Sequence, residues 1–293
     1  MAWEFGLLSG VAKSGVDLGY IDLTVGTSAG SAVGAWFRSG SVTDADVVSR
    51  LEALGGELLG LITELTAVAS QTSGSRTALP TALMEAMDAV AGAGADPATS
   101  NRAIGQLALD APAIPEAAYV SLFGHLVGMQ WPSALVCAGT DVGSGELQTW
   151  DQRSGVSLAQ AVAASCAWPG AFPTVTVAGR RYMDGGLQDA MNAQLAAGQD
   201  TVIGISCRSL ASRDGMPAGE ARRLRNTRDA LDDLKGQGVH VVLVEPDSRF
   251  LAVSEHGAAL MDLSRVRAAN AAGVELGAEV AERFAPGQAI SES

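Results

Sequence analysis

The sequence predicts an α/β protein, in which a central, mostly parallel sheet lies between two layers of helices and a helical insertion interrupts the order. Short apolar runs with strand character alternate with segments of helical period along the chain. Apolar residues make up 47% of the 293 residues, enough to fill a substantial core. Only 5% are aromatic, so we expect close packing through small side chains and one domain over residues 1–293.

The first elements are a predicted helix over residues 3–14, a strand over 21–25 and a second helix over 31–37. Gly15 follows the first helix as a stop signal. Thr43, followed by Asp44 and Asp46, is typical of a helix N-cap with acidic residues in the first turn. The sequence therefore predicts strand, turn and helix within the first 40 residues.

Residues 51–115 have helical period almost throughout, and prolines and glycines divide them into short helices. We expect a helical insertion over about residues 43–130. Apolar side chains at spacings of three and four form one stripe: Leu51, Leu54, Leu58, Leu61, Leu65 and Val68. This stripe favours a helix packed on the core, and the alternative is an apolar lid or lipid-contacting surface.

The second half of the chain continues the alternation of strands and helices. Strands are predicted at 133–138, 146–150, 174–178, 180–183, 201–206 and 239–244, and helices at 157–164 and 264–284. The glycine-rich stretch 139–145 is predicted as the turn of a first hairpin, and Gly179 as the turn of a second.

The net charge is −13, which argues against nucleic acid as a partner. Basic residues cluster at Arg222, Arg223 and Arg225, with Arg228 nearby. Because acidic residues share this segment, the cluster is interpreted as a solvated, mixed-charge helix face.

The cysteines Cys137, Cys166 and Cys207 lie in apolar surroundings and are interpreted as reduced core residues. The cysteines and histidines have no metal-ligand spacing, so we expect no metal site, and no cofactor is indicated. The first residues do not resemble a signal peptide, and no apolar stretch is long enough to span a bilayer. We expect a cytoplasmic protein or one that contacts a membrane peripherally.

The segment Gly26-Thr27-Ser28-Ala29-Gly30 lies between the first strand and the second helix. It has the pattern of a nucleophile elbow, in which a sharp turn exposes the serine hydroxyl and glycines relieve crowding. The N–H of Ala29 at the helix start would face a developing oxyanion. The alternative is an ordinary strand-to-helix turn built from small residues.

A nucleophilic serine needs a base, and two candidates remain from the residues themselves. His256 after Asp247 gives the serine, acid, histidine order of one hydrolase fold, but that fold has several strands before its elbow, and only 25 residues precede Gly26 here. Asp184, followed by Gly185 and Gly186, could act as a direct base. The alternative for Asp184 is an ordinary Asp-Gly hairpin turn.

Three motifs together resemble the patatin-like phospholipase family, particularly its bacterial members, over residues 3 to at least 195. They are the elbow at 26–30, the block Ala161-Val-Ala-Ala-Ser-Cys-Ala-Trp-Pro-Gly-Ala-Phe-Pro173, and Arg181-Tyr-Met-Asp-Gly-Gly186. The resemblance implies a patatin-like fold, with Ser28 as nucleophile and Asp184 as its activating acid. It also implies hydrolysis of carboxylic esters of acyl lipids through an acyl-enzyme, as a serine esterase of phospholipase A type. Ser165, in the second motif, is implied to be structural.

The resemblance further implies a first strand and a glycine-rich oxyanion loop before the helix at 3–14, and the sequence begins after their place. Two expectations follow. Either the natural protein has this loop upstream of Met1, or the short form is a weak or inactive lipid-binding or regulatory homologue. Without the first strand, the strand at 21–25 is expected to have an unpaired edge.

Overall fold

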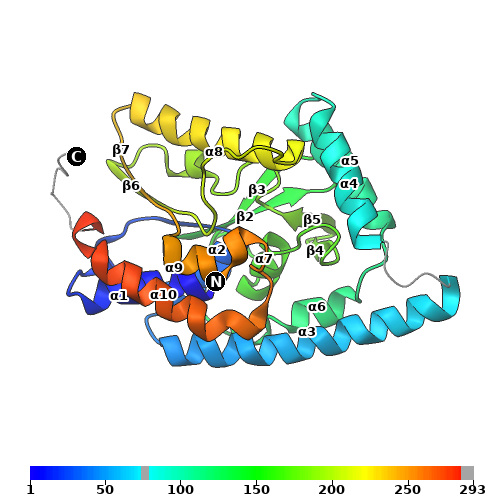
Figure 1. Cartoon of the computed structure of the whole chain (residues 1–293), viewed down its shortest axis with the longest axis horizontal. Helices are drawn as coiled ribbons and strands as arrows, with labels where there is room; N and C mark the ends of the chain where they lie inside the picture. The colour runs from blue at the N-terminus through cyan, green and yellow to red at the C-terminus, as the bar shows by residue number, and fades with distance from the viewer. Residues whose placement is uncertain (74–78, 285–293) are drawn as a thin grey trace.

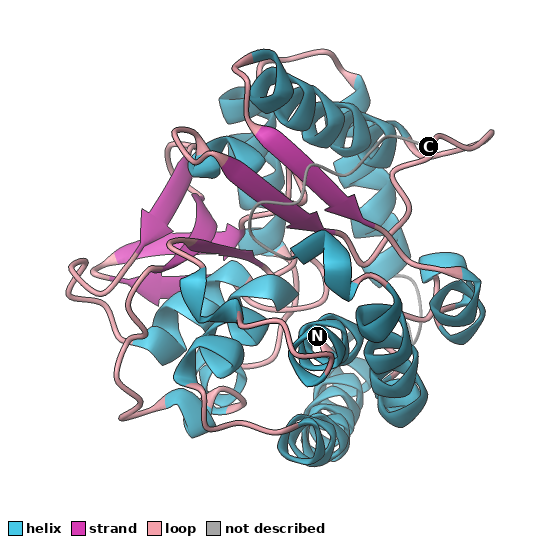
Figure 2. Ribbon diagram, turned by 90° about the vertical axis from the view of Figure 1, so that its left-hand side faces the viewer, coloured by secondary structure: helices cyan, strands magenta, loops and turns pink. Residues whose placement is uncertain are grey.

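The computed structural model describes residues 1–73 and 79–284, with side chains for all of these except residues 62, 64–73 and 79–82. Strands lie in the middle of the molecule with helices on both sides (Figures 1 and 2). The structure thus confirms the α/β class.

One sheet contains β1 (Thr24–Thr27), β2 (Leu135–Asp141), β3 (Leu147–Trp150), β4 (Val175–Val177) and β5 (Arg180–Asp184). In it β2 pairs with β1, β3 and β5, and β5 pairs with β4. The pair β1–β2 is parallel, whereas β2–β3, β2–β5 and β4–β5 are antiparallel. β6 (Thr201–Ile205) and β7 (His240–Val244) form a second, parallel pair. Among the described residues, β1 has no strand partner on its edge away from β2, as expected for this strand.

The register along β2 brings two strand ends together. Thr27 at the end of β1 lies opposite Ala138, and Asp184 at the end of β5 lies opposite the next residue, Gly139. β3 pairs with the β2 residues that contact β1 and with those that contact β5, so β1 and β5 must share the other side of β2. Since β1 is parallel and β5 antiparallel to β2, their carboxyl ends meet.

Helices α1 (Ala2–Lys13) and α10 (Val266–Glu279) pack against each other through glycines. A methyl group placed on Gly10 would lie 2.2 Å from the carbonyl oxygen of Val274, and one on Gly277 would lie 2.1 Å from that of Leu7. Side chains larger than hydrogen would force the two backbones apart. This contact confirms the predicted close packing through small residues.

The segment between the first helix–strand unit and β2 is helical. It contains α3 (Asp44–Ser73), α4 (Leu79–Gly92), α5 (Pro97–Asp110), α6 (Glu116–Ser121) and the short helix η2 (Gly124–Leu126). α3 runs along one side of the molecule beside α1 and α10, and α4 and α5 lie at the far end (Figure 1). Thr43 caps α3 as predicted, since its hydroxyl accepts a hydrogen bond from the N–H of Asp46.

The remaining helices are α2 (Ala29–Ser39), α7 (Leu158–Ser165), α8 (Ala218–Gly236) and α9 (Ser248–Val253). Short 3-10 turns complete the chain at Leu18–Tyr20, Ala193–Ala196, Glu255–Gly257, Leu263–Arg265 and Ala281–Phe284. Among the described helices, none has both the length and the hydrophobicity needed to cross a bilayer.

Several predicted boundaries were wrong. The first strand begins at Thr24 rather than residue 21, because pairing with β2 starts there. Residues 139–141, predicted as part of a turn, extend β2, since all three pair with β5 and residues 139 and 140 also pair with β3. The predicted helix over 264–284 divides into two 3-10 turns and α10, because the regular helix ends at Glu279.

Candidate active site

Ser28 lies at the strand-to-helix elbow between β1 and α2. Its backbone has φ 53° and ψ −125°, a conformation that non-glycine residues rarely adopt. A methyl group on Gly26 would lie 2.4 Å from the Cα of Ser31, so glycine is required there. The sequence-predicted nucleophile elbow is therefore present as a strained turn with Ser28 at its tip.

Gly30 has a different reason to be small. A methyl group on Gly30 would meet open space, so the turn does not need glycine at this position, contrary to the expectation from the motif. Gly30 and Ala29 both line a large cavity beside Ser28. Because Gly30 has no side chain, it leaves room in this cavity. The N–H of Ala29 belongs to the first turn of α2, where helical N–H groups have no intrahelical acceptor.

Asp184 lies opposite Ser28, at the end of β5, and is almost completely buried. Burial raises the pKa of its carboxyl to about 6, although the Ser28 hydroxyl and the N–H of Gly186 each counteract this rise. Oδ1 accepts a hydrogen bond of 2.7 Å from Gly186, and Oδ2 has no hydrogen-bond partner among the described residues. The Ser28 hydroxyl is thus near enough to affect the carboxyl without meeting hydrogen-bond geometry, and Oδ2 can accept a proton.

The two glycines after Asp184 have separate roles. A methyl group on Gly185 would lie 2.4 Å from the carbonyl oxygen of Ala138, so this position must be glycine for the loop to lie against β2. A methyl group on Gly186 would approach Asp184 Oδ1 to 3.1 Å. Glycine here lets the backbone N–H reach the carboxylate.

The segment after α7 holds the elbow together with the loop Asp184-Gly185-Gly186, here called the acid loop. The Ser165 hydroxyl accepts a 2.9 Å hydrogen bond from the N–H of Ser28, and the Cys166 thiol donates to the carbonyl of Ser28. Burial raises the pKa of this thiol far above its usual value, so it stays protonated. The N–H of Asp184 donates to the carbonyl of Ala167 at 3.0 Å. Ser165 is fully buried and serves as an internal support, in line with its expected structural role.

Asn192 provides a second link, which the sequence analysis missed. Its side-chain amide donates to the Thr27 hydroxyl at 2.9 Å and to the carbonyl of Gly185 at 3.1 Å. These acceptors belong to the residues next to Ser28 and Asp184. Asn192 is buried and has a left-handed backbone conformation, which asparagine tolerates better than most residues.

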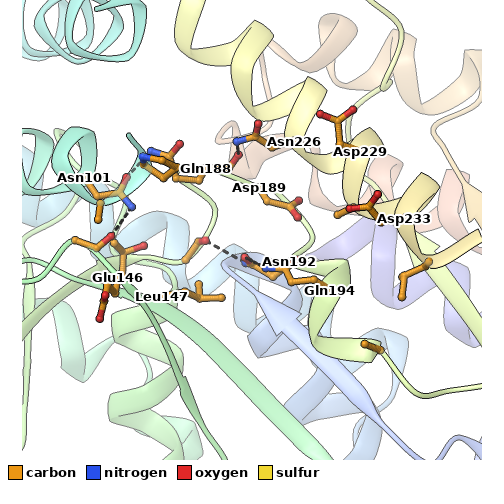
Figure 3. A pocket seen from close by; sticks show the side chains of 18 of the residues that line it. Asn101, Glu146, Leu147, Gln188, Asp189, Asn192, Gln194, Asn226, Asp229 and Asp233 are labelled. Carbon is orange, nitrogen blue, oxygen red and sulfur yellow. Dashed lines mark hydrogen bonds between the residues drawn. The ribbon is translucent and has the colours of Figure 1, made fainter. Parts of the chain in front are cut away.

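A cavity of about 550 Å³ with a mixed polar and apolar lining lies behind the acid loop (Figure 3). Gln188 and Asn192 from the loop line it, together with Asn101 from α5 and Asp229 and Asp233 from α8. Gln188 donates to Asn101 at 2.6 Å. The lining contains several amides and carboxylates but neither Ser28 nor Asp184, so this cavity is separate from the one that these two residues line.

Ser28 and Asp184 open into a different cavity of about 1190 Å³. Apolar side chains form much of its wall, among them Leu8 from α1, Val33 and Phe37 from α2, Leu51 and Leu58 from α3, and Phe123 after α6. Leu51 is buried, while Leu54 and Leu58 are half-buried and pack against the core. The first part of the predicted leucine stripe thus packs on the core and also lines this cavity, whereas the side chains of Leu65 and Val68 lie outside the described ones.

The histidine alternative is not assembled. His256 is exposed in the turn after α9 and lines neither cavity. Asp247 caps α9 and pairs with Arg249, so its carboxylate is engaged away from Ser28. Since geometry comes before pKa in choosing a base, Asp184 is the candidate that the structure places beside Ser28.

The interpretation of the basic cluster on α8 as a solvated face was wrong for two of its members. Arg222 donates to the carbonyl of Ala91 at 3.1 Å and to Ser100 at 3.2 Å, so it joins α8 to α4 and α5. The Arg223 guanidinium lies over the ring of Trp168, 4.8 Å from its centroid, and lines the large cavity. Packing against distant residues turned these side chains inward.

The three cysteines are free, as predicted, and Cys137 and Cys166 are buried. In the part of the chain that the structure describes, no group of three potential metal-ligating side chains lies together. The candidate site therefore consists of a serine, a buried carboxyl and their supporting backbone.

A strained serine between a strand and a helix, facing a buried carboxyl in an α/β fold, is the arrangement of a serine hydrolase. The model of the patatin-like phospholipase family matches residues 1–197, which is most of the chain, and the protein belongs to this family. Comparison with curated proteins finds no match.

Proposed function

We propose that this protein hydrolyses carboxylic ester bonds of acyl lipids through an acyl-enzyme on Ser28, with Asp184 as the base. Membership of the patatin-like phospholipase family supports lipid ester hydrolysis as the activity. The observation that carries the assignment of residues is the meeting of β1 and β5 along β2, which places an elbow serine beside a buried carboxyl. The free Oδ2 of Asp184 favours a catalytic role over a non-catalytic, lipid-binding one.

In the proposed reaction, Ser28 Oγ attacks the ester carbonyl carbon while its proton passes to Asp184 Oδ2. The oxyanion of the tetrahedral intermediate lies near the start of α2, where the N–H of Ala29 and the helix dipole stabilise negative charge. Asp184 then returns the proton to the leaving alcohol. Water then attacks the acyl-enzyme carbonyl carbon while Asp184 accepts its proton; the bond between Ser28 Oγ and the acyl carbon breaks, Asp184 returns the proton to Oγ, and the fatty acid leaves.

The substrate has to place its ester at Ser28 and its acyl chain among apolar side chains. The large cavity offers both, because Ser28 shares it with the leucines of α3 and with the aromatic residues Tyr119 and Phe123. A volume of about 1190 Å³ exceeds the range of about 300–1,000 Å³ typical of small-molecule sites, which suits a long acyl chain. We infer that the substrate reaches this cavity from a lipid surface.

The test is hydrolysis of a fluorogenic acyl ester by the wild-type protein and by three variants. Ser28→Ala and Asp184→Asn should each lose activity by about 10³-fold or more, since each removes a member of a unit that acts together. His256→Ala should keep wild-type activity and serves as the matched control. Loss in His256→Ala with retention in Asp184→Asn would overturn the assignment of the base.

A further inference from the structure

Arg223 is a half-buried cation that forms no ion pair within the described part of the chain. It projects from α8 into the cavity that Ser28 and Asp184 share. Among the described residues, it has the ring contact with Trp168 and no hydrogen bond or ion pair. The neighbouring acid on the same helix face, Glu220, pairs with Arg208 at 3.8 Å and with Arg213 at 2.9 Å.

An unpaired guanidinium in a half-buried position is costly unless a ligand supplies the missing charge. Burial, the largest effect, and the charge of Arg208 lower the pKa of Arg223, while the charges of Glu220 and Asp184 raise it in part. The pKa is lowered on balance, so its surroundings disfavour the cation when the cavity holds no further anion. Stacking on Trp168 offsets part of the free-energy cost of burying the charge and fixes the plane of the guanidinium. The side chain is thus held in place for an anion.

Arg208 adds a second cation to the same wall. It follows β6, lines the cavity and is about half exposed, with a side-chain exposure of 48%. Two guanidinium groups present planar sets of donors that match the oxygens of a phosphate. Much of the rest of the lining is apolar, so the cavity combines an acyl-binding surface with an anion-binding one.

We propose that Arg223, with Arg208, binds the phosphate of a glycerophospholipid whose ester lies at Ser28, so that phospholipids are preferred over uncharged acylglycerols. This inference rests on the proposed function for its kinetic test. It assigns to Arg223 a role in substrate selection and leaves the chemistry to Ser28 and Asp184.

The kinetic test compares two soluble, short-chain substrates below their micellar concentrations: a diacylglycerol and the phosphomethyl phospholipid with the same acyl chains. Arg223→Gln should lower the ratio of kcat/KM values, phospholipid over diacylglycerol, by about 10- to 100-fold, chiefly through KM, as loss of a charge-assisted hydrogen bond implies. The assay is run at pH 8.5, where Asp184 is ionised. An equal loss for both substrates would overturn the proposal, because Arg223 would then act only through the charge of Asp184.

Arg225→Gln is the matched control. Arg225 lies on the same helix, is exposed and does not line the cavity, and the substitution removes the same charge. The ratio should stay at its wild-type value in this variant. Arg223→Lys should give an intermediate ratio, because lysine keeps the charge without the planar set of donors. A ratio in Arg225→Gln that falls as far as in Arg223→Gln would assign the effect to overall charge and overturn the proposal.

A binding measurement separates this proposal from the proposed function. Calorimetric titration of Ser28→Ala with the same phospholipid should show binding that the double variant Ser28→Ala/Arg223→Gln weakens by about 10-fold or more. This holds even if the wild-type protein hydrolyses neither ester. Inorganic phosphate should bind at least 100-fold more weakly than the phospholipid, and equal affinity would make the site one for free phosphate and refute a headgroup site.

Discussion

Replacing Asp184 by asparagine should remove activity and at the same time stabilise the folded protein at neutral pH. Burial raises the pKa of this carboxyl from its ordinary value of 3.8 to about 6. Ionised Asp184 therefore opposes folding by about 3 kcal/mol. Asparagine has nearly the same shape without the charge, so the free energy of unfolding of Asp184→Asn should exceed that of the wild type by up to about 3 kcal/mol at pH 8.

The gain depends on pH in a definite direction. An unfolded aspartate ionises above about pH 3.8, whereas the folded protein keeps Asp184 protonated up to about pH 6. The contribution of Asp184 to the free energy of unfolding of the wild-type protein is therefore highest while Asp184 is protonated in both states. It falls as the pH rises from about 3.8 through about 6. At pH 5 the advantage of Asp184→Asn should fall to about half of its value at pH 8. Urea unfolding at both pH values measures the difference directly.

Asp46→Asn is the control with the opposite sign. Asp46 is exposed, and its hydrogen bonds with Thr43 lower the pKa of its carboxyl, so its charge favours folding. Asparagine at position 46 should destabilise the protein at pH 8. If Asp184→Asn gave no gain in stability, or the same gain at both pH values, the reasoning about burial would be refuted.

Three further predictions follow from the same contacts. The kcat/KM for a neutral ester should rise about tenfold for each pH unit below about 6 and level off above, because Asp184 must be ionised to accept the Ser28 proton; a rate that is flat between pH 5 and 8 would contradict this. Gly185→Ala should lower the melting temperature sharply and remove activity, since its methyl group would lie 2.4 Å from the Ala138 carbonyl oxygen, whereas Gly30→Ala, which meets open space, should melt at or above the wild-type temperature. Ser165→Ala should destabilise the protein by about 1–3 kcal/mol in urea unfolding, because the Ser28 N–H loses its acceptor, and unchanged stability would argue against Ser165 as a support.

The elbow could be predicted from sequence because its signals are local. A strand, a serine between glycines and a helix follow one another within residues 24–39, and the structure has them in that order. The strand boundary was less accessible, because pairing with β2, more than 100 residues later, decides that it starts at Thr24. Local residue patterns do not predict backbone pairing between residues so far apart in the sequence.

Asp184 could not be chosen from the residues by themselves. Its Asp-Gly-Gly sequence is also typical of a hairpin turn, and His256 fitted a formal order. What brings Asp184 to Ser28 is the register of β1 and β5 on the same side of β2, a long-range property of the sheet. The resemblance to a family replaced that missing information.

Arg223 and Asn192 show which site residues sequence patterns miss. Arg223 lies in a helix rich in both charges, and only its packing against Trp168 turns it into the cavity. Asn192 follows the acid loop without a motif of its own, yet it contacts the neighbours of both Ser28 and Asp184. In each case the role depends on contacts between segments that are distant in sequence.

The most direct test of the central claim is intact-mass analysis after treatment with a fluorophosphonate probe, which reacts with activated serines. The wild-type protein should gain the mass of a single adduct, and folded Ser28→Ala should gain none. An adduct that persists in Ser28→Ala, or a folded wild-type protein that forms no adduct, would contradict the assignment of Ser28 as an activated nucleophile.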